Sequence, residues 1–285
     1  MRLNALLTVF LGITAITGVY GCTSENTSQA KIQEQQEIEV TGSGTPYPVL
    51  KVLASAYESK NSNIKFNFSP SSQASGGITG VKNNLVDIGS VSRKPKPDED
   101  DGSLIYQEIA KDALIIATHP SVEGVTNLET KDIKAIYSGK VKNWKALGGS
   151  DAAIILLDRP EDESAKRILR QHYLGKDLKN SPEAVVLRKE SELIKTIQNT
   201  PYSIGAFSLA EAIGNDLKVN RLNIDGVEPN QENVRLGKYK MVRRLGIVRK
   251  KESSDKVNKF IDFVFTEEGA KSIIDSGYTP STKNK

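Results

Sequence analysis

The chain has 285 residues, of which 38% are apolar, 26% charged and 6% aromatic, a composition typical of soluble globular proteins. That length exceeds what one hydrophobic core usually serves, so two lobes are expected. The formal net charge of +4 is small and spread along the sequence, and no nucleic-acid partner is indicated. With two histidines and one cysteine, neither a transition-metal site nor a cofactor is expected.

Residues 1–21 predict a secretory signal peptide: Arg2 is the only charged residue, an apolar stretch follows it, and small residues precede Cys22. The apolar stretch is too short for a membrane span. The tetrapeptide Val19-Tyr20-Gly21-Cys22 resembles a bacterial lipobox, which implies cleavage before Cys22 and lipidation there. Because Cys22 is the only cysteine, no internal disulfide is possible.

Residues 22–37 predict a disordered tether, because beyond alanine they hold a single apolar aliphatic side chain after the cysteine. No later segment is long and apolar enough to span a bilayer. The chain is therefore expected in the cell envelope, in the periplasm or at the outer face of the cytoplasmic membrane, anchored by lipid at Cys22.

From Ile38 onward, short apolar runs alternate with helical patterns, and this order predicts layered α/β structure. Strands are expected at 38–40, 64–69, 87–93, 112–120, 152–158, 202–208 and 241–250. Helices are expected at about 47–58, within 71–86, and at 130–139, 163–174, 191–199, 256–265 and 266–275.

A chain that builds one lobe, crosses to a second and then returns forms a two-lobed protein with paired hinge strands. The crossings are expected near residues 117–120 and 238–246. Lobe I then comprises 38–118 plus 243–285, and lobe II comprises 119–242.

Several segments share one design, in which a strand ends, a loop rich in Gly and Ser follows, and a helix begins. The first is the segment 42–48, the second is 71–78, and Ser92 and Arg93 follow a third strand. Arg159 also stands at a strand end. Hydroxyls and helix N-termini are common as simple caps, but together with guanidinium groups they suit a tetrahedral oxyanion.

The order of the motifs "TGSGTPYP", "SSQASGGI", "VDIGSVSR", "IYSGKVKNWKALGG", "DRPEDES" and "EGAK…GYTP" resembles that of the periplasmic phosphate-binding proteins of ABC transporters, over residues 38–281. The resemblance implies a two-lobed type II periplasmic binding protein with two hinge crossings. Such a protein is a monomer that closes on inorganic phosphate or a related oxyanion, delivers it to an ABC permease in the membrane, and is not an enzyme.

The resemblance also implies which residues contact the ligand. Carried over by position, they are Thr45, Tyr47 through its backbone, Ser72, Ser75, Gly76, Ser92 with the adjacent Arg93, Arg159, Glu163 and Ser164.

The segment after Arg159 departs from the family pattern, because Asp162-Glu163-Ser164-Ala165 stands where the family usually has Gly-Ser-Gly-Thr. Three explanations remain open. Glu163 could accept a hydrogen bond from a protonated oxyanion or from Arg159. Asp162 and Glu163 could instead point to solvent and favour the helix dipole. Finally, the ligand could have changed or been lost.

That departure supports an alternative function on the same fold, as an oxyanion sensor or as a surface scaffold protein with an altered ligand. An extracellular phosphatase is disfavoured because no metal-ligand cluster is evident. His119, His172 and Trp144 are interpreted as structural residues.

Overall fold

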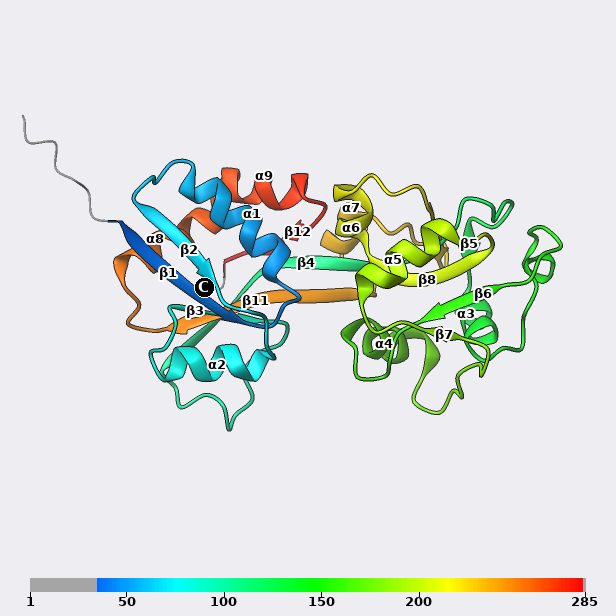
Figure 1. The fold of residues 1–285 in the computed structure, drawn as a ribbon, viewed down its shortest axis with the longest axis horizontal. Helices are drawn as coiled ribbons and strands as arrows, with labels where there is room; N and C mark the ends of the chain where they lie inside the picture. Colours follow the sequence, from blue (N-terminus) through cyan, green and yellow to red (C-terminus); the bar gives the residue numbers. More distant parts are fainter. Residues whose placement is uncertain (1–34, 284–285) are drawn as a thin grey trace, which may run out of the picture. The chain divides into compact units, whose positions relative to one another are not determined.

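The computed structural model describes residues 35–283 (Figure 1). The expected signal peptide, the lipidation site at Cys22 and most of the expected tether lie outside these residues. The first strand begins at Gln36, whose backbone N–H donates to the Asn63 carbonyl at 2.7 Å. Residues 36 and 37 therefore belong to the sheet, which shortens the expected tether at its C-terminal end.

The strands are β1 (Gln36–Gly42), β2 (Ile64–Phe68), β3 (Ile88–Val91), β4 (Leu104–Thr118), β5 (Asn127–Leu128), β6 (Ile155–Asp158), β7 (Val185–Val186), β8 (Ser203–Ser208), β9 (Asn220–Arg221), β10 (Asn223–Ile224), β11 (Val242–Lys250) and β12 (Thr279–Pro280). The α-helices are α1 (Tyr47–Glu58), α2 (Ala74–Lys82), α3 (Thr130–Tyr137), α4 (Ser164–Leu169), α5 (Glu190–Asn199), α6 (Leu209–Gly214), α7 (Gln231–Arg235), α8 (Asp255–Val264) and α9 (Glu267–Asp275). A 3₁₀ helix spans Trp144–Leu147, and a π-helical turn spans Arg170–Leu174 directly after α4.

The main sheet has the strand order β2-β1-β3-β11-β4-β8-β6-β7. β1 runs parallel to β2 and β3, and β8, β6 and β7 are parallel to one another. The long strands β4 and β11 pair antiparallel and run between the two groups (Figure 1). The described chain thus forms two lobes joined by a pair of strands.

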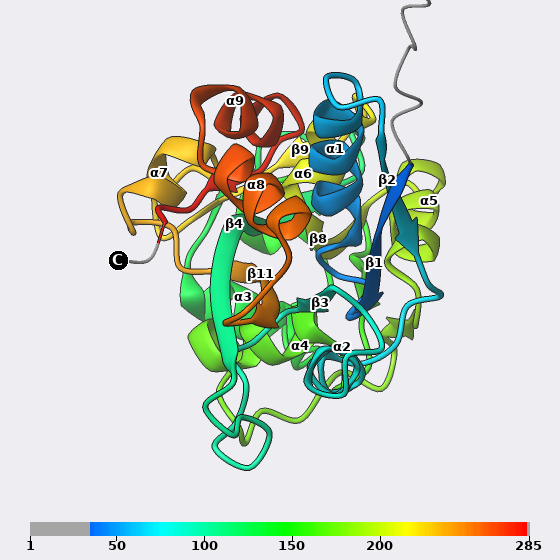
Figure 2. The ribbon, with the colours of Figure 1, turned by 90° about the vertical axis from the view of Figure 1, so that its left-hand side faces the viewer.

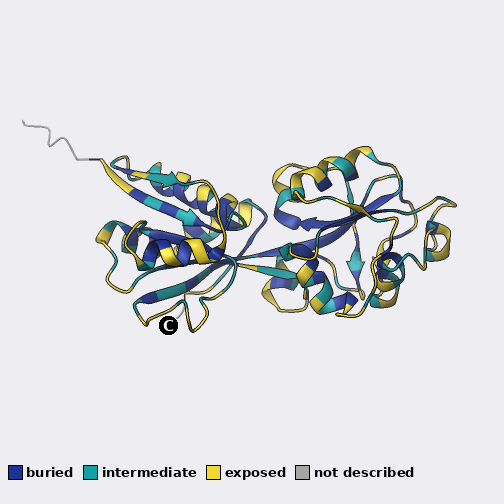
Figure 3. Cartoon of the chain, turned by 60° about the horizontal axis from the view of Figure 1, so that its bottom comes forward, coloured by how far each residue is buried: buried dark blue, intermediate teal, exposed yellow. Residues whose placement is uncertain are grey.

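In the first lobe, α1, α8 and α9 cover one face of the sheet and α2 covers the other (Figures 1 and 2). The helices present apolar side chains to the strands: Leu53 of α1 and Phe260 of α8 share one buried cluster, and Ile78 of α2 lies in another. Figure 3 shows the complementary pattern, with buried strands and helices that expose their outer faces.

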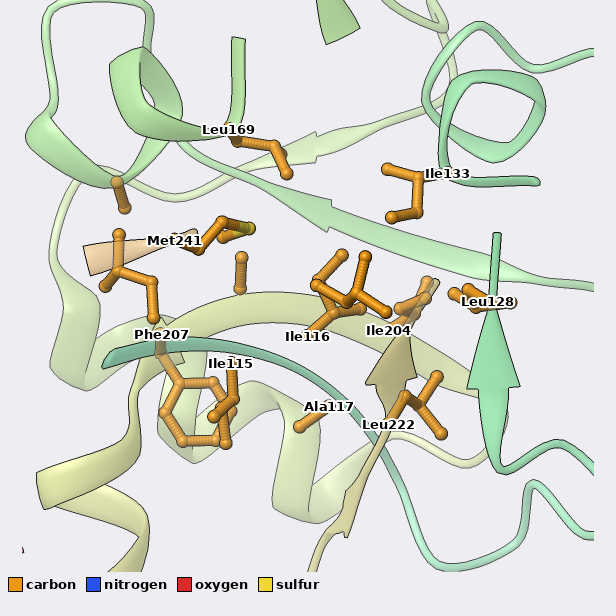
Figure 4. Close-up of a cluster of buried hydrophobic side chains, with 14 of the residues drawn as sticks. Ile115, Ile116, Ala117, Leu128, Ile133, Leu169, Ile204, Phe207, Leu222 and Met241 are labelled. Atoms are coloured by element: carbon orange, nitrogen blue, oxygen red, sulfur yellow. The ribbon is translucent and has the colours of Figure 1, made fainter. Parts of the chain in front are cut away.

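The second lobe has its own hydrophobic core, drawn in Figure 4. Ile116 of β4, Ile204 and Phe207 of β8 and Leu169 of α4 pack together there. Trp144 is fully buried and its indole N–H donates to the Tyr202 carbonyl at 2.9 Å, which agrees with a structural role.

β4 passes from one core to the other between Ala110, which packs in the first lobe, and Ala113, which packs in the second. Ala113 pairs with Val242 at the start of β11. The first crossing therefore lies before the expected 117–120, whereas the second falls within the expected 238–246. The β4–β11 pairing shifts register between Leu245 and Gly246, which pair with Ala110 and Glu108, so Ile109 of β4 is left without an opposite residue on the first-lobe side of this junction.

Most of the expected elements are present. α1 has the predicted bounds 47–58, but β4 begins at Leu104, well before the predicted 112, and the helix predicted over 163–174 is α4 followed by the π-helical turn. Among residues 35–283, no helix is both long and apolar enough to cross a bilayer.

Candidate ligand-binding site

The loops that follow β1, β2 and β3 meet because the carboxyl ends of parallel strands lie at one edge of a sheet. The Ser43 N–H donates to the Ser90 carbonyl at 2.8 Å, and the Ser90 hydroxyl donates to the Ser43 carbonyl at 2.7 Å. The Ser72 N–H donates to the Gly42 carbonyl at 2.7 Å. Gly42 has φ +122°, and a Cβ there would lie 2.3 Å from the Ser90 carbonyl oxygen, so this crossing point requires glycine.

Of the predicted residues in the first of these loops, Thr45 is half-buried and lines the space between the lobes. The Tyr47 side chain turns away from that space. Its hydroxyl donates to the Ser69 carbonyl at 2.9 Å and its ring packs edge-on against Phe68. Burial raises the pKa of Tyr47, which keeps the phenol protonated.

Ser72, Ser75 and Gly76 lie at the exposed start of α2. The Ser72 hydroxyl donates weakly to the Gln73 carbonyl at 3.3 Å. A Cβ on Gly76 would lie 2.5 Å from the Ser72 hydroxyl oxygen, so glycine permits this close approach. Together with Tyr47, these residues do not line the hollow that contains Thr45.

Ser92 and Arg93 follow β3 and line a different hollow, on which Ser164 also borders. The Arg93 guanidinium forms two hydrogen bonds with the Glu99 carboxylate, at 2.6 and 2.7 Å. This pairing raises the pKa of Arg93 and lowers that of Glu99 to about 2. The structure therefore gives Arg93 a protein partner, and its role as a ligand-binding residue stays a prediction.

Arg159 directly follows β6 in the second lobe, and its side chain is only 7% exposed. Its Nη2 lies 3.1 Å from Glu163 Oε2. The Nε and Nη1 atoms are buried and have no hydrogen-bond partner within the described part of the chain. A buried guanidinium with two unsatisfied donors is costly unless another acceptor reaches it, which makes Arg159 the strongest candidate for contacting an anion.

A buried ion pair next to Arg159 holds the start of its side chain in place. Lys166 of α4 is completely buried, and its Nζ lies 2.5 Å from Asp158 Oδ2 at the end of β6. The other Asp158 oxygen accepts the Arg159 backbone N–H at 2.8 Å. The pair therefore ties α4 to β6 and fixes where Arg159 leaves the strand.

The two acidic residues after Arg159 point in different directions. Glu163 is partly buried and contacts Arg159, as the first explanation for the altered segment requires. Asp162 is 69% exposed and pairs with Arg188 at 3.1 Å, as the second explanation requires. The position of Glu163 agrees with the first explanation and that of Asp162 with the second, and the third, a changed or lost ligand, stays open.

Thr45, Arg159, Glu163 and Ser164 line one hollow of about 560 Å3 between the lobes, here called the cleft hollow. The cleft hollow also contains an ion cluster that the sequence patterns did not indicate. Arg243 of β11 contacts Asp112 of β4 at 2.5 Å and Glu190 of α5 at 2.9 Å. The Ser208 hydroxyl donates to the second Asp112 oxygen at 2.8 Å.

The electrostatics of the ion cluster follow from burial. Burial opposes ionisation of Glu190, but Arg243 outweighs it, so the pKa of Glu190 lies below its ordinary value. Glu211 lies nearby without a cationic partner of its own in residues 35–283, and burial together with Glu190 raises its pKa. An acidic residue within the apolar run "KDALIIAT" was the one sequence signal that could have revealed Asp112.

No group of three or more His, Cys, Asp or Glu side chains in the described segment is placed to hold a metal ion. His119 instead hydrogen-bonds through Nδ1 with the Ser121 hydroxyl at 2.9 Å, and burial lowers the pKa of His172. The side-chain donors at the cleft hollow thus include two guanidinium groups, the Lys195 ammonium and several hydroxyls. Such donors can bind an oxyanion.

Comparisons with known proteins agree with this description. Residues 25–268 match the PBP superfamily domain. The phosphate-binding protein PstS of Bacillus subtilis is 31% identical and aligns over 99% of this chain and 94% of its own length. PstS of Borreliella burgdorferi is 28% identical over 96% of this chain and 98% of its own.

Among solved structures, a candidate phosphate ABC transporter substrate-binding protein from Clostridium perfringens with bound phosphate superposes with a TM-score of 0.72. It is 28% identical and covers 87% of this chain and 100% of its own. These relatives are named for binding or transport, and the expectation that this chain is not an enzyme is confirmed by the relationship. The chain belongs to the PstS family of phosphate-binding proteins, two-lobed members of the PBP superfamily.

Proposed function

We propose that this protein captures phosphate between its two lobes and delivers it to an ABC permease. The observation that carries the proposal is Arg159, a buried guanidinium with two unsatisfied N–H donors beside the cleft hollow. A phosphate oxygen bound there would satisfy those donors through charge-assisted hydrogen bonds. The names of the PstS relatives support phosphate as the ligand.

The remaining predicted ligands divide between the lobes. Thr45, Ser72, Ser75, Gly76 and Ser92 would contribute from the first lobe, with the Tyr47 backbone and the adjacent Arg93. Arg159, Glu163 and Ser164 would contribute from the second. Because the α2 loop does not line the cleft hollow, these groups can meet on one small anion only if the lobes move together about β4 and β11.

Glu163 gives the site a way to distinguish anions. Its carboxylate already lies 3.1 Å from the Arg159 guanidinium, and an unprotonated tetrahedral anion placed beside it would be repelled. A phosphate that carries a proton can instead donate a hydrogen bond from its P–OH group to the Glu163 carboxylate. The site is therefore proposed to select monohydrogen or dihydrogen phosphate over sulfate.

We also propose the cellular setting. The lipobox-like sequence before Cys22 supports lipid attachment at that residue, with the folded body outside the cytoplasmic membrane. A chain that acts by closing on a small ligand needs no second copy, which supports a monomer.

Calorimetric titration of the phosphate-free protein tests the proposal, using phosphate, sulfate, molybdate and a phosphonate in parallel. Phosphate should bind, and Arg159→Gln should weaken it at least about tenfold, because hydrogen bonds to charged groups contribute about 1.5–3 kcal/mol each. Arg221→Gln, an exposed substitution in β9, serves as the control and should leave affinity unchanged. If wild-type protein shows no phosphate binding, the transport function is wrong.

One observation favours a second function. Glu163 already pairs with one nitrogen of the Arg159 guanidinium that a ligand would use. The same ion pair would be expected in a sensor, or in a surface scaffold protein that has lost phosphate binding. Absence of binding to all four anions in the same titration would support that alternative.

A further inference from the structure

A second hollow, of about 930 Å3, adjoins the cleft hollow and differs from it in charge. Ser164 and Arg243 border both hollows. The second hollow is lined by seven basic side chains: Arg93, Lys94, Lys111, Arg167, Lys240, Arg243 and Arg244. No Asp or Glu is among its lining residues, and we call it the basic hollow.

Three of the seven cations are neutralised by carboxylates that lie behind the lining. Arg93 pairs with Glu99, Arg244 pairs with Glu108, and Arg243 pairs with Asp112 and Glu190. These side chains add hydrogen-bond donors to the wall of the basic hollow but little net charge.

The other four cations, Lys94, Lys111, Arg167 and Lys240, form no ion pair with any residue in 35–283. Lys94 lies over the Tyr106 ring at 5.9 Å, and Arg167 donates to the backbone carbonyl of Asp162. The basic hollow therefore carries about four unmatched positive charges in a concave space, an arrangement that concentrates anions.

These charges come from both lobes. Lys94 follows β3 and Lys111 lies on β4, whereas Arg167 belongs to α4 and Lys240 lies two residues before the start of β11. Burial, and to a smaller extent Lys240, lowers the pKa of the half-buried His172. This favours the neutral imidazole, which adds a hydrogen-bonding group to the wall of the basic hollow but no charge.

The cleft hollow has the opposite balance. Its carboxylates Asp112, Glu163, Glu190 and Glu211 outnumber its cations Arg159, Lys195 and Arg243. An extended anion with one end bound at Arg159 would therefore place its remaining charged groups in the basic hollow. One orthophosphate has too little charge and too small a size to match both the Arg159 site and the unmatched cations of the basic hollow.

We propose that the basic hollow binds condensed phosphates, so that the protein takes short linear polyphosphates as well as orthophosphate. This inference rests on the proposed function only for the terminal phosphoryl group, which occupies the site at Arg159 and Ser164. The next phosphoryl groups extend along Lys94, Lys111 and Lys240. The chain of phosphates would span both lobes beside the crossing strands.

The test is titration with orthophosphate and tripolyphosphate, at low and at high salt without divalent cations, of wild-type protein and a triple variant, Lys94→Gln, Lys111→Gln and Lys240→Gln. Wild-type protein should bind tripolyphosphate at least about tenfold more tightly than orthophosphate at low salt, with a steeper salt dependence. The triple variant should lose about tenfold for tripolyphosphate and less than about threefold for orthophosphate.

A second triple variant, Lys131→Gln, Lys218→Gln and Lys271→Gln, makes the same change in net charge at lysines that are 76%, 78% and 73% exposed and paired elsewhere. It should bind both ligands as wild-type protein does. Equal losses in the two triple variants would overturn the proposal, since net charge alone would then explain the effect.

Two further results would also overturn it: tripolyphosphate that binds no more tightly than orthophosphate, or a thymidine oligonucleotide of matched charge that binds as tightly as tripolyphosphate. Failure of the proposed function looks different. In that case orthophosphate would not bind wild-type protein at all, while tripolyphosphate binding and its loss in the first triple variant would remain.

Discussion

Glu163 is the residue at which the site departs most from the family pattern, and its contact with Arg159 makes its role testable. Changing Glu163 to Gln replaces an acceptor with an amide that can also donate to an unprotonated anion. Sulfate should therefore bind more tightly, and the preference for phosphate over sulfate should fall about tenfold or more, because an unsatisfied group costs about 1–3 kcal/mol. Competition calorimetry measures this ratio.

Asp162→Asn is the matched control, since it removes the neighbouring charge from a side chain that is 69% exposed and paired with Arg188. It should leave the ratio within about twofold. If the two variants behave alike, Glu163 acts only through long-range charge and does not contact the ligand's proton.

For single residues, the sequence predicted the place in a strand or loop better than the partner in an ion pair. Arg159 could be assigned to a strand end because the apolar run before it is unambiguous. The Arg93–Glu99 pair and the contacts of Arg243 with Asp112 and Glu190 could not be predicted. The latter contacts join residues 131 and 53 positions apart, and a charged residue within a strand pattern carries no indication of its partner.

The junction of α4 with β6 depends on the buried Lys166–Asp158 pair. Lys166→Met leaves the Asp158 carboxylate buried without its cation and should destabilise the fold by about 3–5 kcal/mol. Urea unfolding measures the loss. Adding Asp158→Asn to the same variant should recover most of it, because the remaining buried group is then neutral.

Lys145→Met, which removes one partner of an exposed pair with Asp151, is the matched control and should change stability by less than about 0.5 kcal/mol. A double variant as unstable as Lys166→Met would show that packing, rather than the unpaired charge, causes the loss.

Elements with strong periodicity were predictable, and short or charged ones were not. The apolar face of α1 defined its bounds, whereas α6 and α7 are too short to show a helical period. The first half of β4 was missed because Gln107, Glu108 and Lys111 interrupt its apolar pattern. Asp112 is nevertheless buried there, since Arg243 on the neighbouring strand compensates its charge.

Residues 35–283 form two cores, and within this range only β4 and β11 run as continuous strands between them, which is the basis of the last prediction. Ligand contacts from both lobes favour a closed form that free protein populates less. Saturating phosphate should therefore lower the radius of gyration measured by small-angle X-ray scattering. Arg159→Gln, measured at the same phosphate concentration, should show no decrease, because the second lobe loses its main contact with the anion. An equal decrease in that variant, or none in wild-type protein with phosphate bound, would contradict closure driven by Arg159.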